Sequence, residues 1–452
     1  MLPLSFLSRM ERLLGDEYPA FLRAMTEGEA EHAFRVNTVK LSVSDFEKLS
    51  PLDGGRVPYT PDGFYHDEEK IGRHPCHHAG MVYSQDPGAM SALQAIAIQP
   101  GWRVLDVCAA PGGKSAQIAA AIGENGVLVS NEYVSARCKL LVGNIERLGI
   151  PNALVLNADS ATLRGYFPAY FDMVVVDAPC SGEGMFRKSE DARRMWSEEN
   201  VRHCAARQAD ILADAADTVR AGGYLLYSTC TFSPEENEEQ VAAFLAAHPE
   251  FSLRPVAEAL LPYTAAGLPI NGIDPTACRR FYPHIAPGEG QFMALMQKTG
   301  DPCNHPAPTY RDAGELPQKA DMIALRAFFA DAFGEERYAA RVRSLHGNLV
   351  LPPDIPLPPR GVFAAGVLVG EVRKGILFPH HQLFSAYGKR FVRRLNLALD
   401  DPRVSAYLHG DVIPAPDLAN GYCAVLLEGC PLGGAKIVDG MAKNLYPKGL
   451  RQ

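Results

Sequence analysis

Two cysteines, each at the end of an apolar run typical of a buried strand, constrain the fold of this chain most strongly. Cys180 ends one such run and Cys230 ends another. A third run, 103–107, leads directly into a glycine-rich stretch, 108–114, with the sequence Cys-Ala-Ala-Pro-Gly-Gly-Lys. In open α/β sheets, ligands bind at the carboxyl ends of strands, near the point where strand order reverses. The pattern therefore predicts two thiols and a ligand-cradling loop at one sheet edge.

Strand-like and helix-like patterns alternate from about residue 101 to residue 298. Such alternation favours a mostly parallel sheet covered by helices on both faces, so we expect an α/β, Rossmann-like domain here. The expected strands are 103–107, 126–131, 153–157, 173–177, 223–229 and 291–296, and the expected helices are 113–122, 135–148, 200–220 and 235–247.

The rest of the chain differs in composition from this alternating region. Apolar residues in 6–25 have helical spacing, and 322–346 is expected to be helical as well. Five prolines within 351–359 indicate an extended linker or a rigid loop, and β-like runs follow at 361–369 and 422–428. The expected units are an N-terminal segment at 1–75, the Rossmann-like domain at 76–300, a linker with a helical segment at 301–360, and a β-rich domain at 361–452.

Composition and charge limit the classes of protein to consider. Hydrophobic residues make up 47% of the chain and charged residues 21%, which is the usual mix for globular domains. No apolar run reaches eighteen residues, so no membrane span is expected, and ten cysteines without a CxxC pair indicate reduced thiols in the cytosol. The net charge of -8 argues weakly against nucleic acid, but 361–452 holds eleven Lys and Arg against seven Asp and Glu. This +4 segment is either an RNA contact or a solvated basic face.

The glycine-rich stretch has the residues of a cofactor loop. Small residues and two glycines let the backbone approach a ligand and leave the following helix N-terminus facing it. Glu132, at the end of the next strand, can hold ribose hydroxyls, and Asp159, at the end of the third, can accept from an adenine amino group. The patterns GxGxxG and GxxxxGK[ST] are missing, which counts against NAD and ATP. S-adenosylmethionine, which carries no phosphate, fits better than either, although a purely structural turn is the alternative.

Three core motifs together resemble the Sun-type family of RNA cytosine-carbon-5 methyltransferases. They are CAAPGGK at 108–114, DAPCSGEG at 177–184 and YSTCTFSPEENE at 227–238. The stretches 35–38, 85–90 and 280–284 are similar to outlying motifs of that family, and 443–451 resembles the PUA-like C-terminal domain of its bacterial RsmF-like branch, which acts on small-subunit ribosomal RNA. The resemblance runs from about residue 5 to the end of the chain.

This resemblance implies chemistry for the two thiols. A thiolate that adds to carbon 6 of cytosine makes carbon 5 nucleophilic enough to take a methyl group, and loss of the carbon-5 proton then allows elimination. In the family the nucleophile is the cysteine of the TC motif, here Cys230, and Cys180 is implied to help product release. DNA cytosine methyltransferases use the Pro-Cys thiol instead, so the residues alone leave the two roles exchangeable. Both cysteines could also be buried small hydrophobes without a role.

The remaining site predictions concern charged residues and metals. Asp177 is expected to hold the cytosine edge or to lie near the methyl donor, Lys40 to be a further cation near the site, and the loop 185–188 to touch the RNA backbone. The cluster 74–78 matches no zinc-ligand pattern, so no metal is expected. The residues expected to bind S-adenosylmethionine are Cys108, Ala109, Ala110, Pro111, Gly112, Gly113, Lys114, Glu132, Arg137, Asp159 and Asp177.

The sequence therefore predicts a cytosolic, monomeric enzyme that forms 5-methylcytosine in RNA, with small-subunit (16S) ribosomal RNA or the small ribosomal subunit as partner and no DNA or membrane partner. The target must be an exposed or flipped base, because a stacked base cannot reach the sheet edge. The N-terminal segment and the PUA-like domain are expected to contact RNA backbone and shape. The alternatives are a transfer RNA methyltransferase, an RNA-binding ribosome assembly factor without catalysis, and a DNA methyltransferase.

Overall fold

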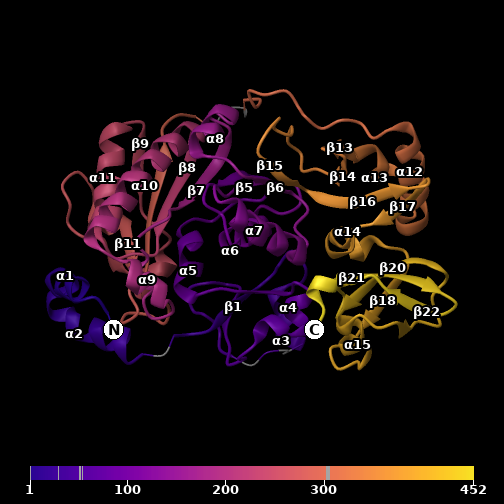
Figure 1. Ribbon diagram of the computed structural model, residues 1–452. Coiled ribbons are helices and arrows are strands. Elements are labelled where there is room, and N and C mark those ends of the chain that lie inside the picture. The colour runs from indigo at the N-terminus through magenta and orange to yellow at the C-terminus, as the bar shows by residue number, and fades with distance from the viewer. Residues whose placement is uncertain (1, 29, 50–51, 53, 302–305) are drawn as a thin grey trace.

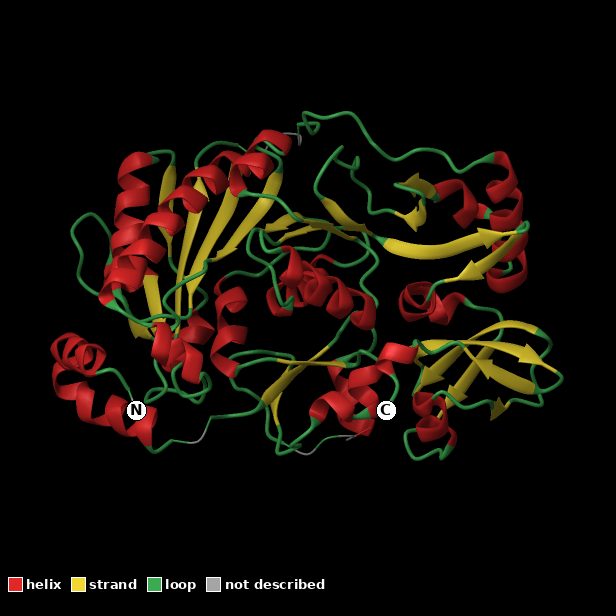
Figure 2. Ribbon diagram, viewed as in Figure 1, coloured by secondary structure: helices red, strands yellow, loops and turns green. Residues whose placement is uncertain are grey.

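The computed structural model describes residues 2–28, 30–49, 52, 54–301 and 306–452 (Figure 1). The other positions of the expected N-terminal unit and residues 302–305 of the expected linker lie outside this description. Helices and strands alternate along the middle of the chain and pack around one large sheet (Figure 2). Within the described residues, no helix is both long and apolar enough to cross a membrane.

Five parallel strands form the centre of the large sheet, in the order β6-β5-β4-β7-β8, and the antiparallel β12 follows β8. All six expected strands are confirmed, with ends that differ by a few residues. They are β4 (Arg103–Asp106), β5 (Val127–Asn131), β6 (Ala153–Leu156), β7 (Phe171–Asp177), β8 (Val219–Thr229) and β12 (Gln291–Lys298).

Helices cover both faces of this sheet. Successive strand residues point to opposite sides, so Val104 belongs to one apolar core and Leu105 to the other. Parallel strands buried on both faces read as continuous apolar runs, which explains why the sequence revealed them. The covering helices are α6 (Gly113–Ile122), α7 (Ser135–Leu148), α8 (Ser160–Tyr166), α10 (Glu198–Thr218) and α11 (Glu238–Ala247).

Shorter strands extend both edges of the sheet. Beyond β12 lie β11 (Cys278–Phe281) and β10 (Ala265–Ala266), while β9 (Phe251–Arg254) pairs with the end of β12. At the opposite edge β15 (Val362–Ala365) pairs antiparallel with β6, although more than 200 residues separate them in sequence. The Rossmann-like sheet therefore includes a strand from the expected C-terminal unit.

The N-terminal unit has a helical part and a small sheet. Helices α1 (Leu4–Leu14) and α2 (Tyr18–Thr26) confirm the helices expected within 6–25, and their Phe6 and Phe21 pack against Phe186 and Phe232, close to the two cysteines in sequence. The other elements up to the large sheet are β1 (Ala33–Val36), α3 (Val43–Leu49), β2 (Gly63–Tyr65), α4 (Pro75–His78), β3 (Val82–Ser84) and α5 (Pro87–Ser91), with strand order β2-β1-β3.

The segment 301–360 is not a simple linker, and a single helix over 322–346 is wrong. Gly334, with φ +75°, ends α12, and a short helix and two strands follow it. Those strands join two later ones in a sheet of order β13-β14-β16-β17, so the expected boundary at 361 falls inside one folded unit. Its elements are α12 (Lys319–Phe333), α13 (Arg337–Arg341), β13 (Arg343–Leu345), β14 (Asn348–Leu351), β16 (Val367–Arg373) and β17 (Ile376–Pro379).

The last part of the chain is the β-rich domain that the sequence predicted. Its five strands are arranged in the order β18-β20-β21-β22-β19, and the expected run at 422–428 is confirmed as β20. The elements are α14 (His381–Tyr387), β18 (Arg394–Leu397), α15 (Arg403–His409), β19 (Ile413–Pro414), β20 (Gly421–Leu427), β21 (Cys430–Val438) and β22 (Met441–Asn444).

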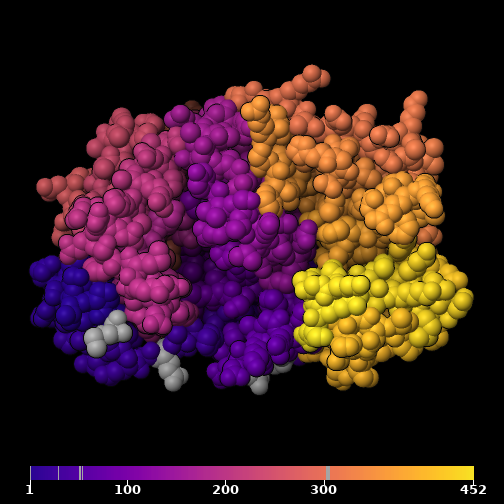
Figure 3. Space-filling model, viewed as in Figure 1, coloured from indigo at the N-terminus to yellow at the C-terminus, as the bar shows by residue number. Residues whose placement is uncertain are grey.

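Lys40 joins three of these parts at a buried point. Its Nζ donates to the carbonyl oxygens of Ala79 (2.7 Å) and Arg147 (3.2 Å), and to that of Pro431 on β21 (2.9 Å). Burial lowers the pKa of the Lys40 amine to about 7, while the three carbonyl acceptors favour its charged form. The C-terminal third accordingly packs directly against the rest of the chain (Figure 3).

Replacing Lys40 should loosen this junction. Lys40→Met leaves three carbonyl oxygens without their donor, at a cost of about 1–3 kcal/mol for each buried acceptor. We expect a lower free energy of unfolding in urea than for the wild type. Lys48→Met, at a side chain that is 75% exposed, is the control and should change little. Equal stability of the Lys40 variant and the wild type would contradict this role.

Candidate active site

The strand order of the large sheet reverses between β4 and β7. The chain passes from β4 to β5 and β6 on one side, then returns to β7 and β8 on the other. Asp106 ends β4 and Asp177 ends β7, and these two strands are paired neighbours. This is the position at which open α/β sheets bind their ligands. The cofactor loop and the loop of Cys180 begin here, and the loop of Cys230 begins at the end of the neighbouring β8.

The glycine-rich loop is tied to the strands on both sides of β4. Val107 donates its backbone N–H to Val175 of β7 (2.9 Å), and Ala109 donates its own to Asn131 of β5 (2.8 Å). Gly112 has φ +114°, a left-handed conformation that strains residues with a side chain, and α6 begins at the next residue. The loop 108–112 therefore lies at the switch point with the N-terminus of α6 behind it.

Two buried carboxylates beside this loop each have an oxygen without a hydrogen-bond partner. Asp106 accepts a hydrogen bond from Ser115 (2.7 Å) on one oxygen, and its Oδ1 has none. Glu132 accepts the N–H of Val134 (2.9 Å) on Oε1, while its Oε2 lies 3.2 Å from an Arg137 nitrogen without a hydrogen bond. Burial raises the pKa of Asp106 to about 7. Such oxygens indicate that hydrogen-bond donors are to be supplied by a ligand.

S-adenosylmethionine fits this arrangement, because its ammonium and ribose hydroxyls are donors and it carries no phosphate. The loop backbone, Asp106 and Glu132 would hold it. Arg137 lies beside them and donates to the carbonyl of Ala110 (2.7 Å). Asp159 lies farther along the same edge, is exposed, and accepts the N–H of Thr162 (2.8 Å), so one of its oxygens caps α8.

A hollow of about 910 Å³ lies next to Asp159. One side of the hollow begins at the residue after Glu132, and the other side is bounded by residues outside the large sheet. Its lining includes Tyr133, Asn157, Tyr166, Tyr310 and Arg360. This hollow is large enough for the adenosine end of the ligand.

Asp177 connects the cofactor loop to the cysteine loops. Lys114, a buried residue of α6, lies with its Nζ 2.7 Å from one Asp177 oxygen. Ser228 of β8 donates to the other oxygen at 2.7 Å. The placement of Lys114 and Asp177 at the sheet edge matches the sequence expectation. The ion pair between Lys114 and Asp177 holds the Asp177 carboxylate at the end of β7 and next to β8, the two strands that lead to the cysteines.

The thiols of Cys180 and Cys230 lie 3.2 Å apart, and both residues are partly exposed. They meet because β7 and β8 are parallel neighbours in which Asp177 pairs with Ser228. The hydrogen bond with Cys230 and burial raise the pKa of the Cys180 thiol well above its usual value. The structure thus brings the two predicted thiols together, and the raised pKa favours the neutral form of Cys180.

One expectation about cations is wrong, and a second stays a prediction. Lys40 is not near the site, because its amine is buried at the junction described above. In the loop 185–188, Arg187 pairs with Glu289 (2.9 Å) and Lys188 with Asp86 (2.7 Å). The cations expected to touch RNA are therefore engaged by carboxylates of the same chain.

Residues of the outlying motifs, for which the sequence gave no role, support the site. Arg35 donates to Gln85 (2.9 Å) and to the carbonyl of Gly113 (3.2 Å), so two motifs meet on the cofactor loop. Arg280 pairs with Glu238 (2.6 Å) and donates to the carbonyl of Phe232 (2.7 Å), two residues after Cys230. The motifs were the only signal in the sequence that could have found them.

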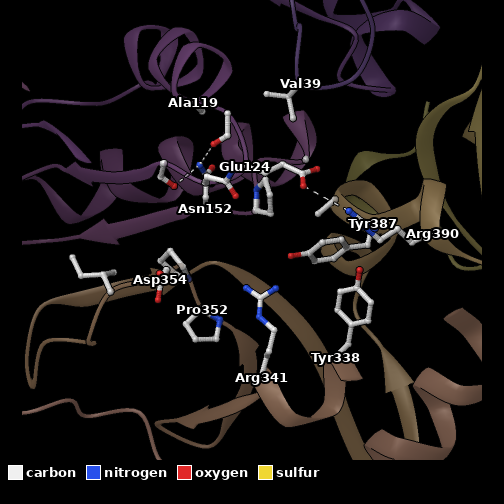
Figure 4. A pocket seen from close by; sticks show the side chains of 18 of the residues that line it. Val39, Ala119, Glu124, Asn152, Tyr338, Arg341, Pro352, Asp354, Tyr387 and Arg390 are labelled. Carbon is white, nitrogen blue, oxygen red and sulfur yellow. Dashed lines mark hydrogen bonds and ion pairs between the residues drawn. The ribbon is translucent and has the colours of Figure 1, made fainter. Parts of the chain in front are cut away.

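A second, larger hollow of about 1290 Å³ lies away from the cysteines (Figure 4). Its lining includes Gly126 and Asn152, just before the amino ends of β5 and β6, opposite the edge that carries the thiols. Arg341 and Tyr387 line the other side, and Arg390 reaches across to Glu124 at 3.7 Å. This groove is the seam between the large sheet and the C-terminal units.

Comparisons with known families match most of the chain. The family described as "16S rRNA methyltransferase RsmB/F" matches residues 93–297. The domain family described as "N-terminal domain of 16S rRNA methyltransferase RsmF" matches residues 2–87, and the one described as "Methyltransferase RsmF PUA domain" matches residues 394–452.

Similar proteins and structures agree with these matches. The "Ribosomal RNA small subunit methyltransferase F" of Klebsiella pneumoniae is 33% identical and that of Erwinia tasmaniensis 30% identical, each over 99% of this chain and 96% of its own length. A methyltransferase homologue from Pyrococcus horikoshii has a TM-score of 0.56 at 28% identity, over 65% of this chain and 94% of its own. NSun6 from Pyrococcus horikoshii, at 21% identity, shares the fold, with a TM-score of 0.55 over 66% of this chain and 99% of its own.

Oε2 of Glu132, which pairs with Arg137 but accepts no hydrogen bond, makes the role of this residue testable. Glu132→Gln keeps an acceptor for the N–H of Val134 but removes the charge. We expect S-adenosylmethionine to bind about 10- to 150-fold more weakly by calorimetry, the loss typical of charge-assisted hydrogen bonds. Glu124→Gln, at an exposed carboxylate beyond the end of α6, is the control. An unaltered affinity in the Glu132 variant would remove this residue from the cofactor site.

Proposed function

Since this chain belongs to the family of RsmF-type 16S rRNA methyltransferases, we propose that it forms 5-methylcytosine in small-subunit ribosomal RNA. It is an S-adenosylmethionine-dependent RNA methyltransferase. The observation that supports carbon 5 of cytosine as the target is the pair of thiols 3.2 Å apart, beside the Asp177–Lys114 ion pair. Addition of a thiolate to the ring is required for this carbon, and a second thiol is suited to product release. We infer that the reaction takes place in the cytosol.

Two cysteines of the chain take part in the covalent steps of the proposed reaction. The Cys230 thiolate adds to carbon 6 of an extruded cytosine, which makes carbon 5 nucleophilic. S-adenosylmethionine, when bound, supplies the electrophilic methyl group. A base then takes the carbon-5 proton, the bond between carbon 6 and the Cys230 sulfur breaks, and the sulfur leaves as a thiolate. Cys180 assists this last stage.

The environment of Cys180 suits a role in release. The hydrogen bond with Cys230 and burial raise the pKa of the Cys180 thiol well above its usual value. The same raised pKa makes Cys180 a thiol that keeps its proton near neutral pH. A neutral thiol 3.2 Å from the attacking sulfur is placed to donate a hydrogen bond to that sulfur as it leaves as a thiolate.

The RNA is expected to contact the β-rich domain at two lysines. Lys436 of β21 and Lys443 of β22 are directly opposite each other in the antiparallel pair, and both are exposed. The Lys436 amine also lies 5.4 Å from the ring centre of Tyr422 on β20. Like charges directly opposite are unfavourable in a sheet, and a phosphate between them removes the repulsion. Other cations of this segment, such as Arg393 beside Asp331, are already paired.

The thiol roles predict opposite outcomes for the two alanine variants. Cys230→Ala should abolish methyl transfer, while S-adenosylmethionine still binds because its loop lies on other strands. Cys180→Ala should still attack the base but release it slowly, so a protein–RNA adduct should persist on denaturing gels. Adduct in the Cys230 variant and none in the Cys180 variant would reverse the assignment.

The lysine pair predicts a change in the salt dependence of RNA binding. Lys436→Gln with Lys443→Gln should weaken binding, and the slope of log affinity against log salt should become shallower by about 1.4–1.8 for two lost phosphate contacts. The matched control neutralises Lys48 and Lys319, two exposed lysines on other elements. An unchanged slope in the Lys436 and Lys443 variant would exclude this surface from RNA docking.

A chain truncated near Leu351 would be a poor test of whether the β-rich domain contacts RNA. It would lack β15, which covers the edge of the large sheet, and Pro431, which accepts from Lys40. Loss of RNA binding by such a chain would report on stability as much as on phosphate contacts. Point variants at exposed lysines avoid this ambiguity.

A further inference from the structure

The residues on both sides of Cys180 are held by groups that do not belong to its own loop. Glu236, six residues after Cys230, accepts the backbone N–H of Ser181 at 2.9 Å. Gln208 of α10 donates to the same carboxylate oxygen at 2.9 Å and to the carbonyl of Pro179 at 3.0 Å. One carboxylate and one amide therefore fix the chain immediately before and after the Cys180 thiol.

The loop of Cys180 makes the reciprocal contact with the loop of Cys230. Glu183, three residues after Cys180, accepts the backbone N–H of Phe232 at 2.9 Å and the hydroxyl of Ser233 at 2.7 Å. Its Oε1 also accepts the indole N–H of Trp196 at 2.9 Å. Each cysteine loop thus contributes one glutamate that contacts the other loop. Glu183 reaches the residues two and three positions after Cys230, and Glu236 reaches the residue next to Cys180.

Direct backbone and side-chain contacts follow the same line between the loops. Gly184 donates its N–H to the carbonyl of Cys230 itself at 2.9 Å. A Cβ on Gly184 would lie 2.9 Å from that carbonyl oxygen and 2.8 Å from Gly290, so glycine is what allows the approach. The hydroxyls of Ser181 and Thr231 meet at 2.8 Å. The two loops are therefore joined at several points on one side of the thiol pair.

Both glutamates are at least 99% buried, and neither forms an ion pair with a described residue. Burying a carboxylate is costly unless hydrogen bonds replace its hydration. For Glu183 three donors do so, whereas Oε1 of Glu236 has no hydrogen-bond partner. Burial raises the pKa of Glu236 to about 7, and its charge is one of the causes that raise the pKa of Cys180. A carboxylate accepts from Ser181 and Gln208 more strongly than a neutral amide would, so the acid holds the Cys180 loop more firmly than glutamine could.

We propose that Glu236 and Glu183 are positioning residues that set Cys180 against Cys230, and that Glu236 governs product release through Cys180. This inference rests on the proposed function. Glu183 fixes the backbone that follows the attacking thiol, and Glu236 fixes the backbone on which the releasing thiol is carried. A displaced Cys180 can no longer hydrogen-bond to the leaving sulfur, so release should slow more than attack.

The test compares Glu236→Gln with the wild type and with Glu239→Gln, an exposed glutamate near the start of α11. Each protein is incubated with S-adenosylmethionine and a cytosine-bearing 16S rRNA fragment, and adduct and methylated RNA are followed on denaturing gels. For Glu236→Gln we expect methylation in the first turnover, at least tenfold slower adduct decay, and unaltered S-adenosylmethionine affinity. Slower adduct formation with a normal adduct lifetime would overturn the proposal.

A double variant separates positioning through Cys180 from an independent effect. If Glu236 acts through Cys180, adding Glu236→Gln to Cys180→Ala should not slow adduct decay further, because interacting residues are non-additive. If the two effects multiply, Glu236 acts elsewhere and the proposal is wrong. Should Glu236→Gln fail to fold, Gln208→Leu removes the contact with Pro179 from outside both loops and should also prolong the adduct. Normal adduct decay in that variant would count against the proposal.

The outcome also distinguishes this inference from the proposed function. Absence of any protein–RNA adduct in both Cys180→Ala and Cys230→Ala would remove the covalent mechanism itself. Adduct in Cys180→Ala together with normal adduct decay in Glu236→Gln would leave the function standing and remove only the positioning role.

Discussion

The parallel pairing of β7 with β8 is the contact on which the rest of the site depends. Its register places Asp177 opposite Ser228, so the two loops that carry Cys180 and Cys230 leave the sheet side by side. A shift of one residue would turn alternate side chains to the other face and would separate the thiols. The apolar cores on both faces of the sheet fix this register, because nearly every side chain of β7 is buried.

Parts of the chain that are distant in sequence stabilise this edge. The N-terminal helices pack Phe6 and Phe21 against aromatic residues of the cysteine loops. Arg35 ties the small N-terminal sheet to the cofactor loop, and Arg280 ties β11 to the loop of Cys230. Lys40 joins the C-terminal domain to the same body. The N-terminal and C-terminal units therefore have fixed positions relative to the thiols, as the proposed action on one base of a folded RNA requires.

The sequence predicted the large sheet well because its strands are buried on both faces and read as uninterrupted apolar runs. It failed at 322–346, where the left-handed Gly334 ends the helix and a strand follows. The pairing of 362–365 with β6 could not be predicted either, because the two strands are more than 200 residues apart in sequence and such a pairing leaves no local pattern. The thiols, Lys114 and Asp177 were found from motifs. We propose a positioning role for Glu183 and Glu236 that the sequence gave no reason to expect, since a carboxylate that accepts a backbone N–H looks like any surface glutamate in sequence.

The central claim is that this chain methylates carbon 5 of cytosine in 16S rRNA. Bisulfite sequencing of ribosomal and transfer RNA tests it most directly, with a deletion strain compared with the same strain carrying the intact gene. The claim predicts that at least one cytosine of 16S rRNA loses its protection from conversion in the deletion strain and regains it when the gene is restored. Unchanged protection throughout 16S rRNA, or a change confined to transfer RNA, would contradict it.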